Sequence, residues 1–489
     1  MNFPKIALLF LCCLSDVTNS KVFNMLVAKQ GEGAYRRIQS AIDRIPDKST
    51  TRFLVYIKNG IYNEKVHLPA TKTNVSFIGE SADGVIITWD DYAGKDGISA
   101  AGSYTFLAEG NDFYAENITI RNSAGDVGQA IAVRTTGDRQ VFKNCRFLGF
   151  QDTYYANKNR QYNLNCYIEG AATDFIYGDA TAVFDSCTIH CVQGGQYITA
   201  PADTKLISVL DDGSTFYHGL LMTRCMITAD ANVSAGSYYL GRPWQPNASS
   251  VFISCKLGNH IKEEGWDVWG DTDNHLSGFF AEFQSVDLQG NPVDTLSRVE
   301  WSEQLRYEEV KRYYNLNYFL RKDCVIWDPT AVTKSLESPS GLTGLNYSLT
   351  WQEVNDAVGY VIIRNDSTIG FSGMNSYDDE TANPSELNTY MIKSVSENGT
   401  LSDPSEEVFF SVSSSDEVKS DNSPIGFIIS DKQIYTSIPV KIEVFSLSGS
   451  LIMTADQHTN LSLYHLSCGI YLVKIRELSG SVLIKKIIL

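Results

Sequence analysis

A repeat of short, β-prone segments is the feature that most restricts the fold of this 489-residue chain. From about residue 51 to residue 288, brief runs of branched and aromatic residues alternate with turns of Asn, Asp, Gly and Ser. Cys145, Cys166 and Cys187 recur at intervals of 21 residues, each directly after Asn or Ser. Repeats of this length predict a solenoid whose coils stack, so that equivalent residues lie above one another. We therefore expect these thiols to be reduced and buried as small apolar fillers rather than joined in disulfides.

The composition describes an ordinary soluble globular protein with an acidic balance. Hydrophobic residues make up 43% of the chain and charged residues 20%. The formal net charge of -17 argues against nucleic acids and anionic membrane surfaces as partners. Beyond the N-terminus, no stretch has the length of a membrane span. No Cys or His cluster has the spacing of a metal site, so we expect neither a metal nor another cofactor.

The first 20 residues have the pattern of a secretory signal peptide. Lys5 precedes a short apolar run, and small residues at 18–20 offer a cleavage site. The alternative is a lipoprotein signal with Cys12 or Cys13 lipidated. Both interpretations predict a secreted, cell-surface or periplasmic protein.

Two carboxylates stand out within residues 149–180. Asp152 and Asp174 each lie among aromatic and branched residues, where an isolated charge is costly to bury. Gln129 and Gln151 are uncharged donors, and Arg242 is a permanent cation. Each of these residues alone is more typical of a structural role, such as an Asp side chain that bonds backbone amides in a turn or a Gln in a stack of interior amides. Together they are the groups needed for acyl transfer by a carboxylate nucleophile.

The segments that carry these residues also resemble a known family. The resembling segments are NGIYNEKV (59–66), AENITIRNSAG (115–125), QAIAVR (129–134), GFQDTYY (149–155), YIEGAATDFIYGDA (167–180), YLGRPW (239–244) and KLGNHIKEEGW (256–266). In this order they are similar to the signature blocks of pectinesterases, and the resemblance runs from about Phe23 to Pro329. The chain departs from the family pattern with Tyr154 for Leu, Tyr177 for Phe, Asp179 for Asn and one extra residue between Glu169 and Asp174.

The resemblance implies an all-β fold, a right-handed parallel β-helix over residues 21–335 followed by two small β-sandwich-like domains. It also implies a mechanism. Asp174, kept ionised by Arg242, would attack the C6 carbonyl of a methylated galacturonate, and Gln129 and Gln151 would stabilise the tetrahedral anion. Asp152 would protonate the departing methanol and then activate water.

The implied substrate is methyl-esterified pectin (homogalacturonan), converted to pectate and methanol by a monomer. Trp244 and Tyr155 are expected to stack on sugar rings. Two alternatives remain open: an esterase acting on another carbohydrate ester, and a non-catalytic carbohydrate-binding β-helix. A pectate lyase would share the fold, but it needs carboxylates that bind calcium.

The C-terminal third changes in composition. Residues 336–410 resemble a fibronectin type III module with Trp351 in its core, which we expect to act as a spacer. Residues 411–424 are polar and predict a linker. Residues 425–489 are similar, in the run Leu466–Lys474, to C-terminal sorting domains of the type nine secretion system. A small β domain without a sorting role is the alternative. Because every pectinesterase-like block precedes residue 335, a chain ending there is expected to keep its activity.

Overall fold

The computed structural model describes residues 22–31, 34–204, 206–323, 325–345, 347–383, 386, 388–410, 427–430, 432–446, 451–467, 469–476 and 482–488. The predicted signal peptide (1–20) and the predicted linker (411–424) lie outside the described residues. The chain forms two compact units. The first comprises Met1–Thr381 and Thr389–Val408, and the second comprises Ala382–Asn388 and Phe409–Leu489.

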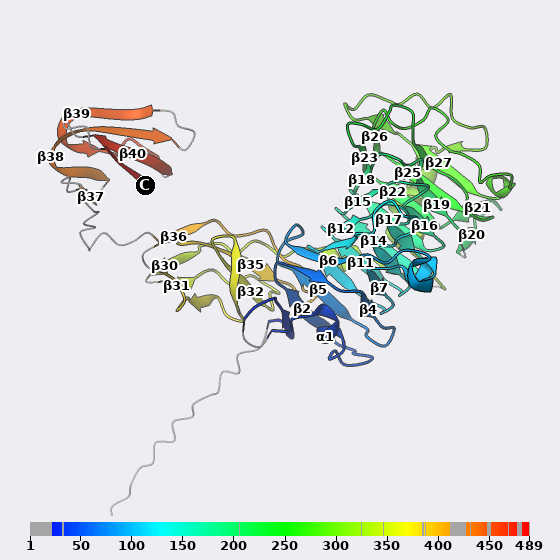
Figure 1. Cartoon of the computed structure of the whole chain (residues 1–489), viewed down its shortest axis with the longest axis horizontal. Coiled ribbons are helices and arrows are strands. Elements are labelled where there is room, and N and C mark those ends of the chain that lie inside the picture. Colours follow the sequence, from blue (N-terminus) through cyan, green and yellow to red (C-terminus); the bar gives the residue numbers. More distant parts are fainter. Residues whose placement is uncertain are drawn as a thin grey trace, which may run out of the picture. The chain divides into compact units, whose positions relative to one another are not determined.

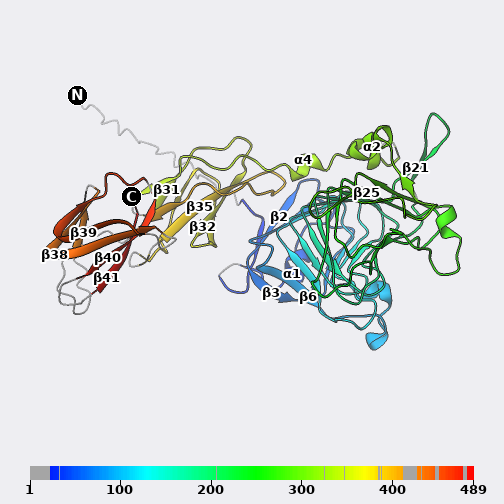
Figure 2. The ribbon, with the colours of Figure 1, turned by 90° about the horizontal axis from the view of Figure 1, so that it is seen from above.

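The first unit is built mainly from three parallel sheets whose strands stack coil upon coil (Figures 1 and 2). An eleven-stranded sheet contains β1 (Met25–Val27), β2 (Phe53–Ile57), β5 (Val75–Gly79), β8 (Tyr114–Glu116), β11 (Gln140–Lys143), β14 (Arg160–Leu164), β17 (Thr181–Asp185), β22 (Leu220–Thr223), β25 (Ser249–Ile253), β27 (Phe279–Phe283) and β29 (Glu303–Gln304). A nine-stranded sheet contains β3 (Gly60–Asn63), β6 (Val85–Trp89), β9 (Thr119–Asn122), β12 (Arg146–Leu148), β15 (Tyr167–Gly170), β18 (Thr188–Cys191), β23 (Met226–Ala229), β26 (Lys256–Leu257) and β28 (Val286–Asp287). A seven-stranded sheet contains β4 (Val66–Leu68), β7 (Phe106–Ala108), β10 (Val133–Thr135), β13 (Tyr154–Ala156), β16 (Ile176–Gly178), β19 (Tyr197–Pro201) and β24 (Tyr239–Gly241). This is the parallel β-helix that the sequence predicted.

Short elements complete the β-helix. They are α1 (Ile38–Ile42), the 3₁₀ turns η1 (Lys95–Gly97), η2 (Ala100–Gly102) and η3 (Asn274–Leu276), the hairpin β20 (Ile207–Val209) and β21 (Thr215–Tyr217), α2 (Tyr307–Tyr314), α3 (Leu316–Phe319) and α4 (Thr330–Thr333). Helix α1 lies at the start of the solenoid, and its side chains Ile38, Ala41 and Ile42 are buried. Helices α2 and α3 follow the last strands of the β-helix and bury Val310, Tyr313 and Phe319.

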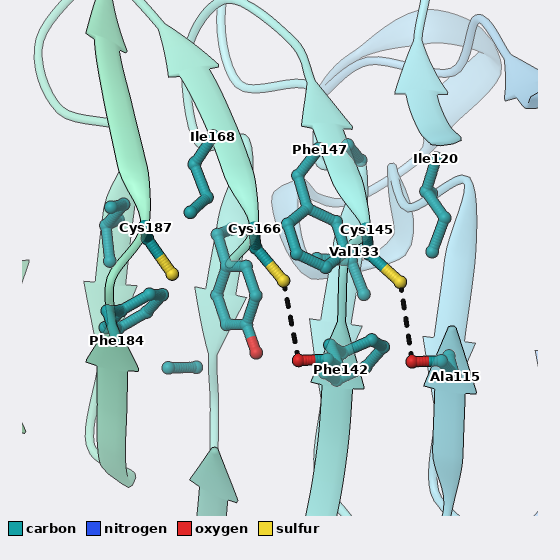
Figure 3. Close-up of a cluster of buried hydrophobic side chains, with 14 of the residues drawn as sticks. Ala115, Ile120, Val133, Phe142, Cys145, Phe147, Cys166, Ile168, Phe184 and Cys187 are labelled. Carbon is teal, nitrogen blue, oxygen red and sulfur yellow. Dashed lines mark hydrogen bonds between the residues drawn. The ribbon is translucent and has the colours of Figure 1, made fainter. Parts of the chain in front are cut away.

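The cysteines form a ladder inside the β-helix, as expected (Figure 3). All six cysteines among the described residues are free and buried, and five of them begin the turn into the nine-stranded sheet: Cys145, Cys166, Cys187, Cys225 and Cys255. The thiol of Cys145 lies 3.5 Å from the carbonyl oxygen of Ala115, one coil below. Stacked thiols of this kind fill the interior as apolar groups.

The residue before each ladder cysteine turns the chain between two sheets. Asn144, Asn165 and Ser186 have positive φ angles of 53°, 52° and 55°. Short polar side chains, Asn above all, tolerate this left-handed backbone better than branched ones do. In each recurring Asn/Ser–Cys pair, the Asn or Ser therefore forms the corner of the coil, and the Cys fills the interior next to it.

The eleven-stranded sheet is buried on both faces. Its inner side chains join the main core, while Leu54, Tyr56 and Ile78 point outward into a second apolar cluster. Over the later coils this cluster is covered by α2, α3 and their flanking residues. Over the early coils it is covered by residues of the segment 336–408.

Residues 336–410 form two small antiparallel sheets. One contains β30 (Thr343–Leu345), β31 (Ser348–Thr350) and β34 (Ser376–Asp378), and the other contains β33 (Ser367–Ser372), β32 (Gly359–Arg364), β35 (Asn388–Val395) and β36 (Val408–Phe410). Trp351 is buried and packs edge-on against Tyr360, as a core residue would. We call this segment the sandwich module.

The sandwich module is bonded to the β-helix by several buried contacts. The Thr368 hydroxyl lies 2.7 Å from the hydroxyl of Tyr56, and its carbonyl accepts a 2.6 Å bond from Lys58. The turn Asn398–Thr400 inserts against the sheet, where a side chain at Gly399 would meet Ile78 at 3.1 Å. The module therefore packs against the β-helix within one compact unit, which the sequence did not indicate.

The second unit is an antiparallel sheet. It contains β37 (Phe427–Ser430), β38 (Gln433–Ser446), β40 (Ile470–Arg476) and β41 (Val482–Ile488), with β39 (Leu451–Ser462) paired to β38. Ile442, Val444 and Val473 are fully buried in its own core. Within the described residues of both units, we find no helix with the length and apolarity of a membrane span.

Candidate active site

The five residues predicted to act in chemistry are positioned by neighbouring strands of the seven-stranded sheet. Gln151 and Asp152 directly precede β13, Asp174 precedes β16, and Arg242 directly follows β24. Gln129 pairs with Gln151 in a parallel bridge one coil earlier. The backbone N–H of Asp152 donates to the carbonyl of Asp174 at 3.0 Å, so the two acids lie on adjacent coils.

Asp174 is paired with the predicted cation. The Arg242 guanidinium donates to Asp174 Oδ1 at 2.8 Å, and the Asp174 residue is only 6% exposed. Burial raises the pKa of Asp174, and the hydrogen bond and charge of Arg242 oppose that rise.

Two aromatic rings hold the Arg242 guanidinium. Its central carbon lies 4.0 Å from the ring centre of Tyr197 and 3.9 Å from that of Trp269. The Tyr197 hydroxyl in turn donates to Asp267 at 2.7 Å. Cation–π contacts on both faces fix the guanidinium plane. We did not single out Tyr197, Trp269 or Asp267 from the sequence, because no spacing connects them to Arg242.

Asp152 lies in a different environment from Asp174. Burial first, and then the charge of Asp174, raise the pKa of Asp152 to about 7. The uncharged side chains of Tyr177, Gln129 and Gln151 oppose that rise. The two carboxyls therefore have different surroundings, Asp174 facing a cation and Asp152 facing uncharged groups and a second carboxyl.

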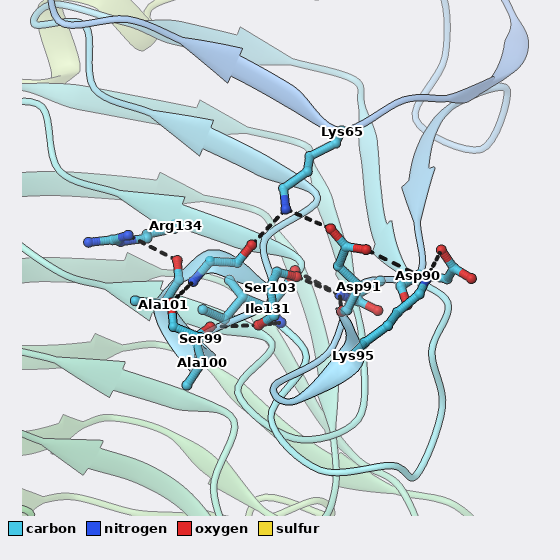
Figure 4. A network of polar contacts seen from close by, with 12 residues as sticks. Lys65, Asp90, Asp91, Lys95, Ser99, Ala100, Ala101, Ser103, Ile131 and Arg134 are labelled. Atoms are coloured by element: carbon cyan, nitrogen blue, oxygen red, sulfur yellow. Dashed lines mark hydrogen bonds and ion pairs between the residues drawn. The ribbon is translucent and has the colours of Figure 1, made fainter. Parts of the chain in front are cut away.

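The Gln129 turn is bonded to the loop that contains η1 and η2, because the Gln129 carbonyl accepts from the backbone N–H of Ala93 at 2.9 Å. Lys65 joins two parts of this loop by bonding Asp91 at 2.6 Å and the carbonyl of Gly102 at 2.7 Å (Figure 4). On the neighbouring coil, the Gln151 amide donates to Thr173 at 2.9 Å.

A line of aromatic side chains runs beside the acids and includes both residues predicted to contact sugars. Tyr155 stacks on Tyr177 with ring centres 4.3 Å apart and planes 8° apart. Tyr177 meets Trp244 edge-on at 5.9 Å, and Trp244 lies 6.4 Å from Trp269. Stacked and edge-on rings offer apolar faces of the kind that pack against sugar rings.

The extra residue before Asp174 is accommodated within the turn between β15 and β16. Ala172 adopts a left-handed backbone with φ 54°, unusual for a residue with a Cβ. Its carbonyl accepts from the N–H of Gln196, and the N–H of Ala171 donates to Phe150. The turn is thus tied to both neighbouring coils, and Asp174 lies beside Arg242.

Comparison with known proteins assigns the family. The family model "Pectinesterase" matches residues 24–323. The chain belongs to the pectinesterase family. This pectinesterase is 37% identical over 302 residues to "Pectinesterase 31" of Arabidopsis thaliana, covering 60% of this chain and 90% of that protein. It is 35% identical to a "Probable pectinesterase/pectinesterase inhibitor" of Brassica napus, of which it spans 50%. The pectinesterase is accordingly a carboxylic ester hydrolase.

Solved structures share the fold of the pectinesterase. "Pectin methylesterase from Carrot" superposes with a TM-score of 0.55 at 30% identity, covering 61% of this chain and 93% of that one. "Pectin methylesterase PemA from Erwinia chrysanthemi" gives 0.52 at 27% identity, covering 63% and 99%. A second family model, "Secretion system C-terminal sorting domain", matches residues 427–489 and confirms the sorting-domain resemblance.

Metal ligation is not evident in the part of the pectinesterase that the structure describes. Those residues contain no group of three or more His, Cys, Asp or Glu side chains arranged to hold an ion.

Proposed function

We propose that this pectinesterase hydrolyses the C6 methyl esters of polygalacturonate, with Asp174 as nucleophile and Asp152 as acid and base. The observation that carries the proposal is the contrast between the two acids. Asp174 bonds Arg242 at 2.8 Å, whereas no cation of the described residues acts on Asp152 and its pKa is raised to about 7. This division suits one ionised nucleophile and one proton donor at the same pH.

In the first step, an Asp174 oxygen attacks the ester carbonyl carbon. The tetrahedral anion is stabilised by the amides of Gln129 and Gln151, and the Gln151 amide must turn from Thr173 toward the new oxyanion. The bond from C6 to the methoxy oxygen then breaks, and Asp152 gives its proton to the departing oxygen, so that methanol leaves. The galacturonate acyl group remains on Asp174 as a mixed anhydride.

In the second step, Asp152 is ionised and acts as a base. It takes a proton from a water molecule, the water oxygen attacks C6, and the bond to Asp174 breaks. The product is a carboxylic acid on the sugar, which loses its remaining proton to solvent, while Asp152 holds a proton again and Asp174 returns as a carboxylate to its pairing with Arg242.

Trp244 and Tyr155 would hold the sugar rings beside these acids. Trp244 adjoins Trp269, and Tyr155 carries the guanidinium of Arg134 over its ring at 5.4 Å. Arg134 is itself fixed by Asn157 and by the carbonyl of Ala101 (Figure 4). A cation so close to the aromatic line would favour a polysaccharide that already contains some free carboxylates.

We further propose that the protein is exported and acts outside the cytoplasm. The match of residues 427–489 to a secretion sorting domain supports this, together with the signal-like N-terminal 20 residues. We also propose that the sandwich module is a fibronectin type III-like domain.

The test is an assay of purified protein on methyl-esterified pectin, with methanol and unsaturated product measured in parallel. We expect methanol at the rate at which free carboxylates appear, without ultraviolet absorbance from unsaturated sugars. Acetylated polysaccharide serves as the matched ester control. Acetate release without methanol release would contradict the proposed substrate, and absorbance without methanol would indicate a lyase.

A further inference from the structure

Arg242 is held in its site by few hydrogen bonds. Within the part of the chain that the structure describes, its side chain makes one, the 2.8 Å bond from Nη2 to Asp174 Oδ1. Its Nε is buried and has no hydrogen-bond partner among those residues. Two parallel bonds to a carboxylate would fix the plane of a guanidinium, whereas one bond fixes only a point of contact. Another kind of contact must therefore hold the plane of this guanidinium.

Two aromatic rings supply that contact. The guanidinium carbon of Arg242 lies 4.0 Å from the ring centre of Tyr197 and 3.9 Å from that of Trp269. A planar guanidinium stacks on aromatic faces and is attracted by their π electrons. Tyr197 is only 8% exposed, so it contacts Arg242 but offers little surface to a sugar.

Tyr197 is itself fixed from two directions. It lies in β19 and pairs with Tyr239 of β24, and the two rings stack with centres 5.4 Å apart and planes 11° apart. The Tyr197 hydroxyl donates to Asp267 Oδ2 at 2.7 Å. The backbone N–H of Asp267 donates in turn to the carbonyl of Gly241 at 3.1 Å, and Gly241 directly precedes Arg242.

Asp267 also connects the two rings that hold Arg242. It lies two residues before Trp269, so the segment that supplies the second ring is bonded to the first ring through the Tyr197 hydroxyl. Strands β19 and β24 and this segment therefore form one frame around the guanidinium.

We propose that Tyr197 is a positioning residue for Arg242 and, through it, for the Asp174 carboxylate. Its ring holds the plane of the guanidinium, and its hydroxyl ties the ring to Asp267. This inference rests on the proposed function, because it takes Asp174 as the nucleophile. It adds a buried residue that acts on the reaction through Arg242 rather than through the sugar.

Loss of the Tyr197 ring should lower turnover more than substrate affinity. Without the ring, the guanidinium can turn about its one bond to Asp174, and the carboxylate is no longer held in one orientation. A misplacement of about 1 Å in a reacting group can cost about 10²-fold in rate. The bound sugar is affected less, because the buried Tyr197 side chain does not hold it.

The experiment compares the wild-type full chain with Tyr197→Leu and Tyr197→Phe. For each protein, kcat and KM for methanol release from methyl-esterified pectin are measured beside thermal unfolding. Tyr197→Leu should lower kcat by about 10- to 30-fold, the value of one desolvated cation–π contact, and change KM by less than about twofold. Tyr197→Phe keeps the ring and loses only the bond to Asp267, so its kcat should fall by only about two- to fivefold.

Tyr217→Leu is the matched control. The Tyr217 ring stacks on Phe279 with centres 5.7 Å apart and planes 6° apart, and its hydroxyl donates to the carbonyl of Ser277 at 3.3 Å. Tyr217 is thus another stacked, hydrogen-bonded tyrosine, but its ring does not hold the guanidinium of Arg242. This variant should keep the wild-type kcat, whatever it does to the unfolding temperature.

A double variant tests whether Tyr197 acts through Arg242. Arg242→Lys keeps a positive charge but has no planar guanidinium for the ring to hold. Adding Tyr197→Leu to Arg242→Lys should therefore cost much less than the 10- to 30-fold expected in the wild-type background. Losses that multiply in full would show that Tyr197 acts independently of Arg242 and would overturn the inference.

The remaining outcomes separate this inference from the function on which it rests. A wild-type protein that releases no methanol removes the proposed function and the inference with it. An active wild type whose kcat is unchanged in Tyr197→Leu, or equally reduced in Tyr217→Leu, overturns the Tyr197 inference alone. A raised KM with unchanged kcat would overturn it too, since Tyr197 would then act on substrate binding.

Discussion

Two buried carboxylate–cation pairs lie on different sheets of the β-helix, and their surroundings differ in an instructive way. Glu116, on the eleven-stranded sheet, lies 3.3 Å from Lys143 and is 2% exposed. It also accepts from the Tyr114 hydroxyl at 2.8 Å and from the backbone of Leu401, in the sandwich module, at 3.3 Å. The Glu116 carboxylate therefore has a cation and two hydrogen-bond donors from the protein as partners.

The second pair, Asp174 and Arg242, has another acid beside it. Asp152 is about as deeply buried as Glu116, yet none of the described groups that act on its pKa carries a positive charge. Burying a carboxyl in this way costs stability unless it stays protonated. The comparison teaches that the Glu116 site contributes to stability, whereas the Asp152–Asp174 site, as we propose, holds an acid with a pKa near 7 for a reaction.

The largest expected effect comes from ending the chain at residue 335. The predicted site residues all remain, but Leu54, Tyr56 and Ile78 lose the cover of the sandwich module. At about 1.5–3 kcal/mol for each large side chain, the free energy of unfolding should fall by about 5 kcal/mol. Urea unfolding of the shortened and full chains measures this. Equal stability, with activity retained as the sequence led us to expect, would show that the module is only a spacer.

Asp152→Asn should lower kcat for methanol release by about 10² to 10⁴, because the amide cannot protonate the leaving oxygen. The pH dependence of its residual activity should no longer show the ionisation near pH 7 that we assign to Asp152. Esters with better leaving groups should lose less. A raised folded-state pKa means that wild-type stability declines as pH rises through about 7, so the variant should gain relative stability there. If the unfolding temperature of the variant changed with pH in the same way as that of the wild type, this assignment would be contradicted.

Lys143→Met should act on stability and leave methanol release unchanged. It leaves Glu116 buried without its cation, which costs about 3 to 5 kcal/mol of unfolding free energy. Burial already raises the pKa of Glu116, so the loss should grow as pH rises. Lys256→Met, at an exposed lysine of β26, is the matched control and should change little. Loss of turnover in folded Lys143→Met protein would show that the two sites are coupled.

Gln151→Ala should reduce kcat by about 10² to 10³, the usual cost of one lost oxyanion donor. The KM should change less, because this amide is proposed to bond the transition state rather than the bound ester. Gln289→Ala removes an exposed amide far along the chain and serves as the control. A variant that loses only substrate affinity would indicate that Gln151 binds the ground state.

The sequence predicted the β-helix well because its local signals agree with the fold. The 21-residue recurrence of cysteines and the preceding Asn or Ser mark the corners of the coils, where the backbone is left-handed. Runs such as residues 53–57 and 75–79, which the sequence indicated only as short strands, are buried along almost their whole length. They did not indicate which segment covers the outer face, because apolar surface does not specify its partner.

The candidate site was predicted through the family resemblance rather than from the residues alone. Asp152, Asp174 and Arg242 come from separate segments, and only the coil register brings them together. Tyr197 and Trp269 were missed, since their contacts with Arg242 depend on how distant loops fold over β24. Tyr177 was noticed as a departure, but its stacking on Tyr155 could be seen only in the structure.

The most direct test of the central contrast is methanol release by Asp174→Asn measured beside Glu116→Gln, with thermal unfolding of both. Each change turns one buried carboxylate into an amide of the same size. Asp174→Asn should lose about 10⁴-fold or more in turnover while remaining folded, because no acyl-enzyme can form. Glu116→Gln should unfold at a lower temperature and keep wild-type turnover when folded. An active Asp174→Asn, above all beside an inactive but folded Glu116→Gln, would contradict the account.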